Sequence, residues 1–289
     1  MIKPSFEAIN QLSQNSFLVR TFEEEAFTSP YHYHPEFELT LITKGSGKRY
    51  VGNHMDYYEE GDLVFLAANL PHCWKTDCIQ KGEINASSLV IQFTENFMGA
   101  DFFNKPEMID IKNFLERSRC GILLKGKIVS EISNAMQNMA GEEVKFKQLT
   151  VLFEILYNLA ITTECTTLNR FSNFAVPNGS NLERLNAVFS YIINNFKTGV
   201  TLNEAANLAN MTPNAFCKYF KKNTHKTFIE VVLDYRLRYS TIQLIHTDKS
   251  VGQICFNCGF SDVAHFSRMF KKKMNISPLQ FKKSFAKEL

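Results

Sequence analysis

Hydrophobic residues follow two different spacings along the chain, and the change lies near residue 105. Up to that point, short runs rich in β-branched and aromatic residues alternate with glycine turns, such as Gly45-Ser46-Gly47 and Glu60-Gly61-Asp62. The clearest runs are residues 37–43, 48–51, 62–66 and 88–93. Many short strands at close spacing are typical of a β-sandwich or β-barrel, which the sequence therefore predicts for residues 15–105.

After Pro106 the hydrophobic residues recur every three or four positions. The two segments with this period are Ile128, Ile132, Ala135, Met136 and Met139, and then Leu149, Leu152, Phe153, Leu156, Leu159 and Ala160. They predict two amphipathic helices that pack on the strands, on each other or on a second subunit. A polar stretch over residues 162–181 follows, and its composition predicts a linker.

The last ninety residues contain the same short pattern twice, over residues 202–222 and 251–272. Each copy has a short amphipathic helix, a tight turn, and a second helix that ends in an aromatic residue and two lysines. Phe216 and Phe266 lie 50 positions apart, as do Phe220 and Phe270. A repeat of this size predicts one supersecondary unit used twice, a helix-turn-helix.

Caps, turns and buried faces can be assigned in both copies. In the first copy the apolar face is Leu202, Ala205, Ala206 and Leu208, the turn is at Asn210, and Thr212 and Pro213 begin the second helix. In the second copy the apolar face is Val251, Ile254, Cys255 and Cys258, Gly259 supplies the turn, and Asp262 is the cap. The Cys255–Cys258 pair is expected to pack in the core, because no second pair accompanies it.

The second helix of each copy is expected to leave a small, polar and cationic face outward, because the two phenylalanines at i and i+4 share the inner side. The outward residues are Asn214, Cys217, Lys218, Lys221 and Lys222 in one copy and Val263, Ala264, His265, Ser267, Arg268, Lys271 and Lys272 in the other. Such a face suits the major groove of DNA. An ordinary bundle with solvated lysines is the alternative, and the duplication favours DNA.

Charge is distributed unevenly between the two halves. From Asn178 onward there are 16 Lys and Arg against 7 Asp and Glu, a net charge of +9, whereas the remainder carries 16 against 22, a net charge of −6. The formal charge of +3 for the whole chain conceals this difference. A basic domain beside an acidic one is expected when only one of them meets a polyanion.

The C-terminal region resembles the AraC family of transcription regulators over about 100 residues. The matching residues are Arg236, Leu237, Ile254, Gly259, Phe260, Ser261, Phe266, Ser267, Arg268, Phe270, Lys271, Lys272, Ile276, Ser277, Pro278 and Phe281. The resemblance implies two helix-turn-helices joined by a long helix, with base-reading residues at Asn214, Cys217, Lys218, Val263, Ala264, His265, Ser267 and Arg268. His225 and Asn275 stand where the family usually has glycine, and Lys218 stands where it often has arginine. Because lysine lacks the guanidinium fork that binds guanine, the first unit is expected to be the weaker reader.

A group of histidines in the strand region has the composition of a metal or ligand site. His32, His34 and Glu38 share parity, so an extended segment turns them to one face, and His72 follows Pro71 on a later segment. Three imidazoles and a carboxylate are a competent set for a divalent Zn, Ni, Mn or Fe ion. A hydrogen-bonded polar cluster that lines an effector pocket is the alternative.

The spacing of these residues resembles a cupin, a small β-barrel whose first motif has His32, His34, Glu38 and Gly45 and whose second has Gly61, Asp62, Pro71 and His72. In AraC-type sensors such a barrel usually binds a small effector and is seldom an enzyme. Arg49, Tyr50 and Trp74 lie on or near the same strands. This mixture of polar and aromatic residues suits a sugar-like or otherwise hydroxylated ligand.

Whole-chain properties indicate a globular protein of two domains, with 289 residues, 45% of them hydrophobic and 21% charged. The seven cysteines are odd in number and scattered, which argues against a disulfide scaffold. No apolar run approaches 18 residues, and the sequence MIKPSFEAIN has no signal-peptide pattern, so we expect a cytoplasmic protein without a membrane partner.

The sequence thus predicts an α+β two-domain protein. Its parts are a cupin-like effector-binding and dimerisation domain over 1–165 (β-barrel about 15–105, packed helices about 106–163), a linker over 166–181, and an all-α DNA-binding domain over 182–289. We expect a non-enzymatic, sequence-specific regulator that binds double-stranded operator DNA and a small effector, forms a homodimer and has RNA polymerase as a candidate partner. The alternatives are a metal-dependent cupin enzyme fused to a DNA-binding module, and a ligand-independent DNA-binding protein.

Overall fold

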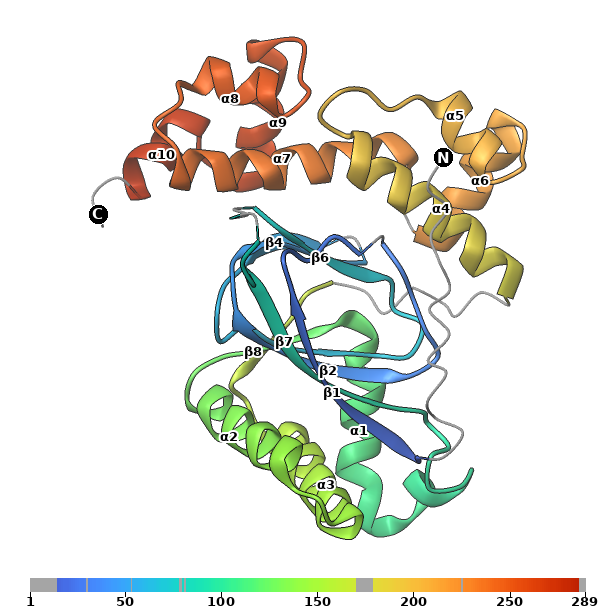
Figure 1. Cartoon of the computed structure of the whole chain (residues 1–289). Coiled ribbons are helices and arrows are strands. Elements are labelled where there is room, and N and C mark those ends of the chain that lie inside the picture. The colour runs from blue at the N-terminus through green and yellow to red at the C-terminus, as the bar shows by residue number, and fades with distance from the viewer. Residues whose placement is uncertain are drawn as a thin grey trace. The chain divides into compact units, whose positions relative to one another are not determined.

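The computed structural model describes residues 15–29, 31–52, 54–77, 80, 82–169, 179–224 and 226–285. The chain divides into two compact units between Val176 and Pro177 (Figure 1). The first unit combines strands with helices and the second is helical, which confirms the α+β two-domain class. Within the described residues, no helix combines the length and the apolar character needed to cross a membrane.

Two antiparallel sheets form the N-terminal unit. The six-stranded sheet has the order β1-β7-β2-β5-β8-β9, and the three-stranded sheet has the order β4-β3-β6. The strands are β1 (Phe17–Glu24), β2 (Phe37–Lys44), β3 (Gly47–Val51), β4 (His54–Tyr58), β5 (Leu63–Leu66), β6 (His72–Thr76), β7 (Ala86–Phe93), β8 (Ile122–Leu124) and β9 (Cys165–Thr167).

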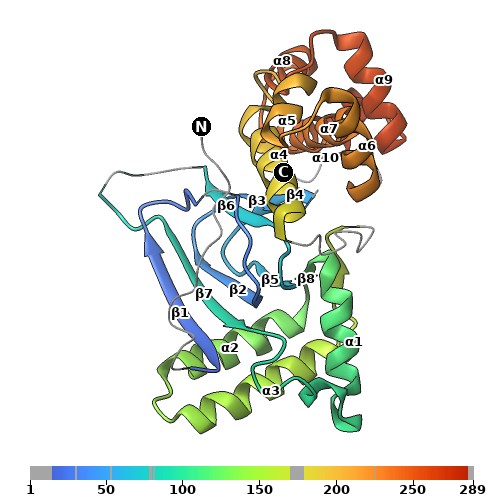
Figure 2. The ribbon, with the colours of Figure 1, turned by 90° about the vertical axis from the view of Figure 1, so that its right-hand side faces the viewer.

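One face of the six-stranded sheet is apolar and is covered by helices α1 (Ile109–Arg117), α2 (Lys127–Gly141) and α3 (Lys145–Ile161). Alternate residues of its strands, such as Phe37, Leu39, Ile91 and Phe93, join the helices in one hydrophobic core. Figures 1 and 2 both show α2 and α3 on this side and the three-stranded sheet on the other. The predicted helices are α2 and α3, and they pack on the strands and on each other.

The opposite face of the six-stranded sheet packs on the three-stranded sheet only in part. Ile42, Val64 and Leu66 from the large sheet meet Val51 and Trp74 from the small one in a second, smaller core. Several of the remaining positions of this inner face are polar. They include Glu38 and Thr40 of β2, which pair across the strands with Gln92 and Val90 of β7.

The strands form an open sandwich rather than the expected closed barrel. Among the described residues, no strand ladder joins the two sheets. All four strands predicted from the sequence are present, as β2, β3, β5 and β7. Five others were not predicted.

The predicted linker is wrong at its start. Residues 165–167 form β9, which pairs with β8 at the edge of the large sheet. Leu168 and Asn169 continue along the same unit through backbone hydrogen bonds to Gly121 and Cys120. Residues 170–178 of the linker lie outside the described residues, and helix α4 begins at Gly179, before the predicted domain start.

The C-terminal unit is all helical, as predicted. Its helices are α4 (Gly179–Asn195), α5 (Leu202–Leu208), α6 (Pro213–Thr224), α7 (Phe228–His246), α8 (Val251–Asn257), α9 (Val263–Met274) and α10 (Pro278–Phe285). Thus α5 and α6 form one helix-turn-helix and α8 and α9 form the second, with α7 between them in the chain (Figure 1). Capping boxes at Thr227 and Ser250 start α7 and α8.

Candidate functional site

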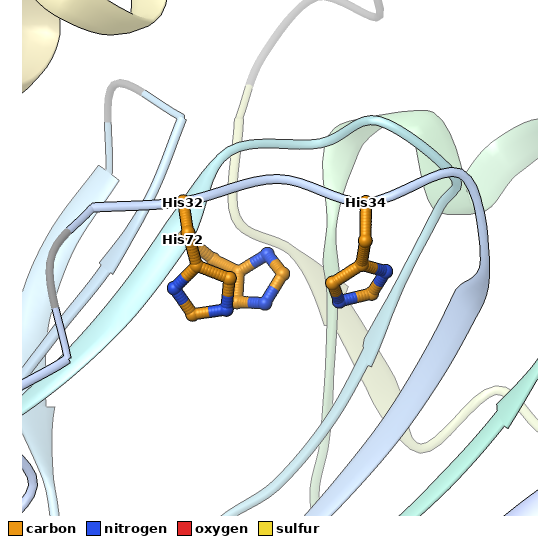
Figure 3. Close-up of side chains that lie close together, drawn as sticks. All are labelled: His32, His34 and His72. Atoms are coloured by element: carbon orange, nitrogen blue, oxygen red, sulfur yellow. The ribbon is translucent and has the colours of Figure 1, made fainter. Parts of the chain in front are cut away.

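Three histidines meet at one end of the N-terminal sandwich. His32 and His34 lie on the segment that enters β2, and His72 begins β6; one ring nitrogen from each lies within 4.8 Å of the others (Figure 3). Backbone hydrogen bonds between His32 and His72 in both directions, of 3.1 and 2.9 Å, fix the two segments side by side. The expectation that a later strand brings His72 to this group agrees with the structure.

Glu38 completes the cluster and holds His34 in its charged form. His34 Nε2 donates to Glu38 Oε2 at 2.9 Å, and His34 Nδ1 lies 3.4 Å from Glu36 Oε2. Burial by itself lowers the pKa of His34, but the nearby carboxylates of Glu36 and Glu38 prevail and raise it to about 10. Burial by itself raises the pKa of Glu38, whereas His72 and His34 lower it below its ordinary value. His34 and Glu38 therefore form a buried ion pair.

His72 is neutral and presents an unpaired nitrogen. Its Nδ1 lies 2.7 Å from the carbonyl oxygen of Leu70, to which it donates. Burial lowers the pKa of His72 to about 3, although the nearby Glu38 opposes the change. The Nε2 atom is buried without a hydrogen-bond partner and lies 3.7 Å from Glu38 Oε1. The hydrogen bond to the Leu70 carbonyl fixes the orientation of the ring and leaves the lone pair on Nε2. Metal-binding histidines commonly have such a hydrogen bond on their second nitrogen.

A cavity of about 170 Å³ lies against the cluster. It is lined by Phe22, Glu24, Phe27, Ser29, His32, Glu38, Thr40, Ile42, Trp74, Ser88, Val90 and Gln92. Trp74 is therefore placed as expected, but Arg49 and Tyr50 do not line this cavity. Arg49 is engaged instead in an ion pair with Asp62. Tyr50 lies on the opposite side of β3 from Arg49, because neighbouring residues of a strand alternate.

Gln92 and Thr40 are cavity residues that the sequence analysis missed. Gln92 Nε2 donates to Glu38 Oε2 at 2.8 Å, and Thr40 Oγ1 donates to Glu38 Oε1 at 2.5 Å. Both are polar residues inside otherwise apolar strands, and this interruption is the signal that would have identified them. Trp74 Nε1 and Gln92 Oε1 are buried without a hydrogen-bond partner, so the cavity wall offers one free donor and one free acceptor.

In the first helix-turn-helix the predicted turn and inner face are confirmed. Asn210 has a φ of 54°, in the left-handed region, and Thr212 Oγ1 accepts from the Ala215 amide at 3.4 Å at the start of α6. Phe216 and Phe220 are fully buried and pack against Phe228 at the start of α7. All five predicted outward residues of α6 are exposed.

The second helix-turn-helix repeats this construction with glycine at the turn. Gly259 has a φ of 84°, Asp262 accepts from the His265 amide at 2.6 Å, and Phe266 and Phe270 are fully buried. Asn275 ends α9 in the left-handed conformation that the family usually gives to glycine, whereas His225 lies outside the described residues. On α9, Ala264, Arg268, Lys271 and Lys272 are exposed and Val263, His265 and Ser267 are half-buried.

Helix α7 is tied by its side chains to other elements of the C-terminal unit. Arg236 Nε donates to the carbonyl oxygen of Phe196, just after α4, at 2.8 Å. Asp234 accepts from Lys226, which precedes α7, at 2.5 Å and from Lys273 of α9 at 2.7 Å. These contacts make the two helix-turn-helices parts of a single packed body.

Comparison with known proteins agrees with this construction. Residues 205–284 match the model of a helix-turn-helix domain. The chain is 23% identical over 265 residues to the uncharacterized HTH-type transcriptional regulator YdeC of Bacillus subtilis, covering 88% of this chain and 86% of that one. It is 21% identical over 255 residues to the HTH-type transcriptional activator RhaS of Mannheimia succiniciproducens, covering 88% and 89%. Residues 205–284 of this chain are therefore a helix-turn-helix domain similar to those of AraC-type regulators, and the chain resembles transcription regulators over most of its length.

The likeness of the chain to solved structures is limited. A probable AraC family regulator from Rhodopseudomonas palustris is 20% identical, with 35% of this chain and 96% of that chain covered and a TM-score of 0.34. ToxT from Vibrio cholerae is 14% identical, with 92% and 97% covered and a TM-score of 0.35. The chain is a DNA-binding transcription regulator, and the relatives matched over most of its length are transcription regulators too.

Proposed function

We propose that the chain is an effector-responsive regulator that reads its operator through α6 and α9 and binds a small molecule in the cavity of its cupin-like N-terminal domain. The observation that supports the first part is the duplicated unit, in which buried phenylalanine pairs leave an exposed cationic face on each second helix. Two such helices on one packed body enter successive major grooves, ~34 Å apart along the DNA.

The two reading helices contribute differently to specificity. Arg268 of α9 is exposed and carries a fork that binds the O6 and N7 atoms of guanine together. Lys218 of α6 is exposed too, but its ammonium group is a single point charge that suits a phosphate. Consequently α9 supplies most of the base discrimination and α6 supplies mainly affinity.

Operator binding by single variants tests this assignment. Arg268→Ala is expected to cost about 1–3 kcal/mol and to relax preference at one base pair. Lys218→Ala is expected to weaken binding on all sequences alike and to reduce the salt slope by about one. Lys283→Ala, on the exposed side of α10, is the control and should change neither property. Unchanged operator affinity in both reading-helix variants refutes the assignment.

The second part of the proposal is supported by the unpaired polar atoms of the cavity wall. A buried donor or acceptor without a partner costs about 1–3 kcal/mol. Trp74 Nε1 and Gln92 Oε1 are two such atoms in one cavity, and a hydroxylated ligand satisfies both. The aromatic face of Trp74 suits the apolar side of a sugar-like ring.

The cavity is also connected to the start of the linker. Val51 pairs with His72 across β3 and β6, and its carbonyl oxygen accepts from Asn169 Nδ2 at 3.1 Å. Leu168 packs with Val51 in the smaller core. A structural change at His72 is therefore transmitted through Val51 to Leu168 and Asn169.

Thermal denaturation with a metabolite panel tests ligand binding. A ligand at ~100 Kd adds about 2.7 kcal/mol to the stability of the domain that binds it. Gln92→Leu, which removes the free acceptor, is expected to abolish the shift. If no compound raises the melting temperature, the ligand-independent alternative is favoured.

We propose as a second role that His32, His34 and His72 hold a divalent metal ion. Nitrogen atoms of three imidazoles converge and His72 Nε2 is unpaired, so the residues fit such an ion once His34 gives up the proton that it donates to Glu38. The ion would supply a positive charge for oxygen atoms of a ligand. Catalysis is not proposed, since the relatives are transcription regulators.

Elemental analysis of untagged protein tests the metal. Stoichiometric zinc, nickel, manganese or iron is expected, with loss in His72→Gln and retention in His54→Gln, a buried histidine of β4 outside the cluster. Absence of metal in protein that has been dialysed against each ion refutes this role.

We propose finally that the regulator is a homodimer that pairs through α3. Phe146, Tyr157 and Ile161 are 72%, 50% and 54% exposed. With the partly exposed Phe153, they follow one another at intervals of seven, four and four residues, so they form a single stripe along the helix. A stripe of this kind needs an apolar partner. RNA polymerase remains a proposed partner of the DNA-bound protein.

A further inference from the structure

Arg20 of β1 is an arginine with no partner. Its Nε and Nη2 atoms are shielded from solvent and make no hydrogen bond, and no ion pair within the described residues includes it. Arg20 as a whole is half-buried, and these two shielded N–H groups have lost their water without gaining a protein acceptor. Such a residue indicates a missing negative group.

The strand register places Arg20 on the cavity side of the six-stranded sheet. Phe22 and Glu24, which share its parity on β1, both line the cavity. Its direct neighbour across β1 and β7 is Val90, which lines the cavity as well. Arg20 is not itself among the residues that line the cavity, but it lies on the same face of the sheet and beside two residues that do, Phe22 and Val90.

The carboxylates around the cavity do not supply the missing charge. Glu38 already accepts hydrogen bonds from Thr40, Gln92 and His34. Glu24 is four residues from Arg20 on the same face of the strand, which corresponds to ~13 Å. Glu24 therefore lies at the other end of this face of β1, and its negative charge repels an anion toward Arg20.

We propose that the effector is a small hydroxylated molecule with one anionic group, a carboxylate or a phosphate, which Arg20 binds. The Nε and Nη2 atoms form one edge of the guanidinium fork, and this edge accepts two oxygens of one anion side by side. Trp74 and Gln92 face the hydroxylated part of the molecule. The inference rests on the proposed ligand-binding function and specifies its chemistry.

Matched neutral and anionic compounds test the inference on the full chain by thermal denaturation. The probes are D-galactose with D-galacturonate, D-glucose with D-gluconate, and D-ribose with ribose phosphate, so that the carboxylate and phosphate arms are separate. At least one anionic member is expected to raise the melting temperature of the wild-type protein by ~5–10 °C near 100 Kd, well beyond its neutral counterpart.

The variant Arg20→Met provides the second measurement. It is expected to lose the anion-dependent shift without lowering the melting temperature of the ligand-free protein, because Arg20 makes no hydrogen bond or ion pair that the substitution would remove. Arg49→Met is the matched control: Arg49 is a buried arginine of the same domain, but it is paired with Asp62, so its removal lowers the melting temperature and spares the preference for anions.

Each result has a defined meaning. Equal stabilisation by neutral and anionic members overturns the inference and leaves the ligand-binding function standing. An unaltered anion-dependent shift in Arg20→Met overturns it as well. If no member of the panel stabilises the wild-type protein, the inference fails for these anions, and a shift with other neutral metabolites still supports ligand binding.

Discussion

Gly259 lies where the turn of the second helix-turn-helix passes against the backbone that follows α4. Its φ of 84° is in the left-handed region, and a Cβ atom would stand 2.5 Å from the Phe196 oxygen and 2.8 Å from the Lys197 oxygen. Because both obstacles are backbone atoms, they cannot rotate away. We expect Gly259→Ala to lower the free energy of unfolding by about 2–4 kcal/mol, measured by chemical denaturation of the full chain.

Gly252 provides the matched control for this substitution. It lies in α8 of the same helix-turn-helix, and nothing stands within 4 Å of the position of a Cβ atom. Alanine is preferred over glycine in a helix by roughly 0.5–1 kcal/mol, so Gly252→Ala is expected to stabilise. Similar destabilisation by both substitutions would contradict the steric explanation.

Individual residues were predictable where local chemistry decides their role. The turn at Asn210, the glycine turn at Gly259 and the cap at Asp262 follow from backbone preferences that act within a few residues. Arg49 was misassigned because its partner Asp62 is fixed by the packing of two sheets, which a sequence does not display. Arg20 was missed for the same reason, since only the register of β1 with β7 places it beside the cavity.

At the scale of elements, Asp234 joins three parts of the DNA-binding unit. Its carboxylate is 16% exposed and holds the ammonium groups of Lys226 and Lys273, which are 39% and 42% exposed. We expect Asp234→Asn to reduce the stability of this unit by about 0.5–1 kcal/mol at neutral pH, because partly exposed ion pairs contribute little each. Urea denaturation of the full chain measures the change.

The stability difference between the wild-type protein and Asp234→Asn should decrease as the pH falls. Burial by itself raises the pKa of Asp234, but the hydrogen bonds from Lys226 and Lys273 lower it below its ordinary value. A carboxylate with a lowered pKa stabilises the folded state above its unfolded pKa of about 3.9, and this stabilisation disappears as the pH falls through the folded value. The wild-type protein and Asp234→Asn should therefore converge in acid. The control Asp248→Asn, at an exposed position, should show no difference at any pH.

Elements were predictable where one hydrophobic period dominates. Helices α2 and α3 and strands β2 and β7 bury a continuous apolar face, so their periods are visible in the sequence. Strand β1 was missed because its cavity side carries Arg20 and Glu24, polar residues that a half-buried strand normally turns to solvent. Strands β8 and β9 have only three residues each and exist because they extend an existing sheet edge.

At the scale of the whole molecule, charge and chemistry divide along the chain. The repeated cationic helices lie in the unit after residue 177, and the histidine cluster, the cavity and the partnerless arginine lie in the unit before it. The uneven charge predicted this division correctly. The openness of the sandwich was not predictable, because barrel closure depends on strand pairing between sheets rather than on the pattern within a strand.

The proposed homodimer depends on the exposed apolar stripe of α3. In a two-fold interface every stripe residue occurs twice, so one substitution changes two contacts. We expect Tyr157→Lys to weaken self-association by at least ~30-fold, as removal of an interface anchor worth about 2 kcal/mol does. Asn158→Lys is the control, because Asn158 is the next residue, exposed but off the stripe. Sedimentation equilibrium measures both, and a dimer that survives Tyr157→Lys places the interface elsewhere on the molecule.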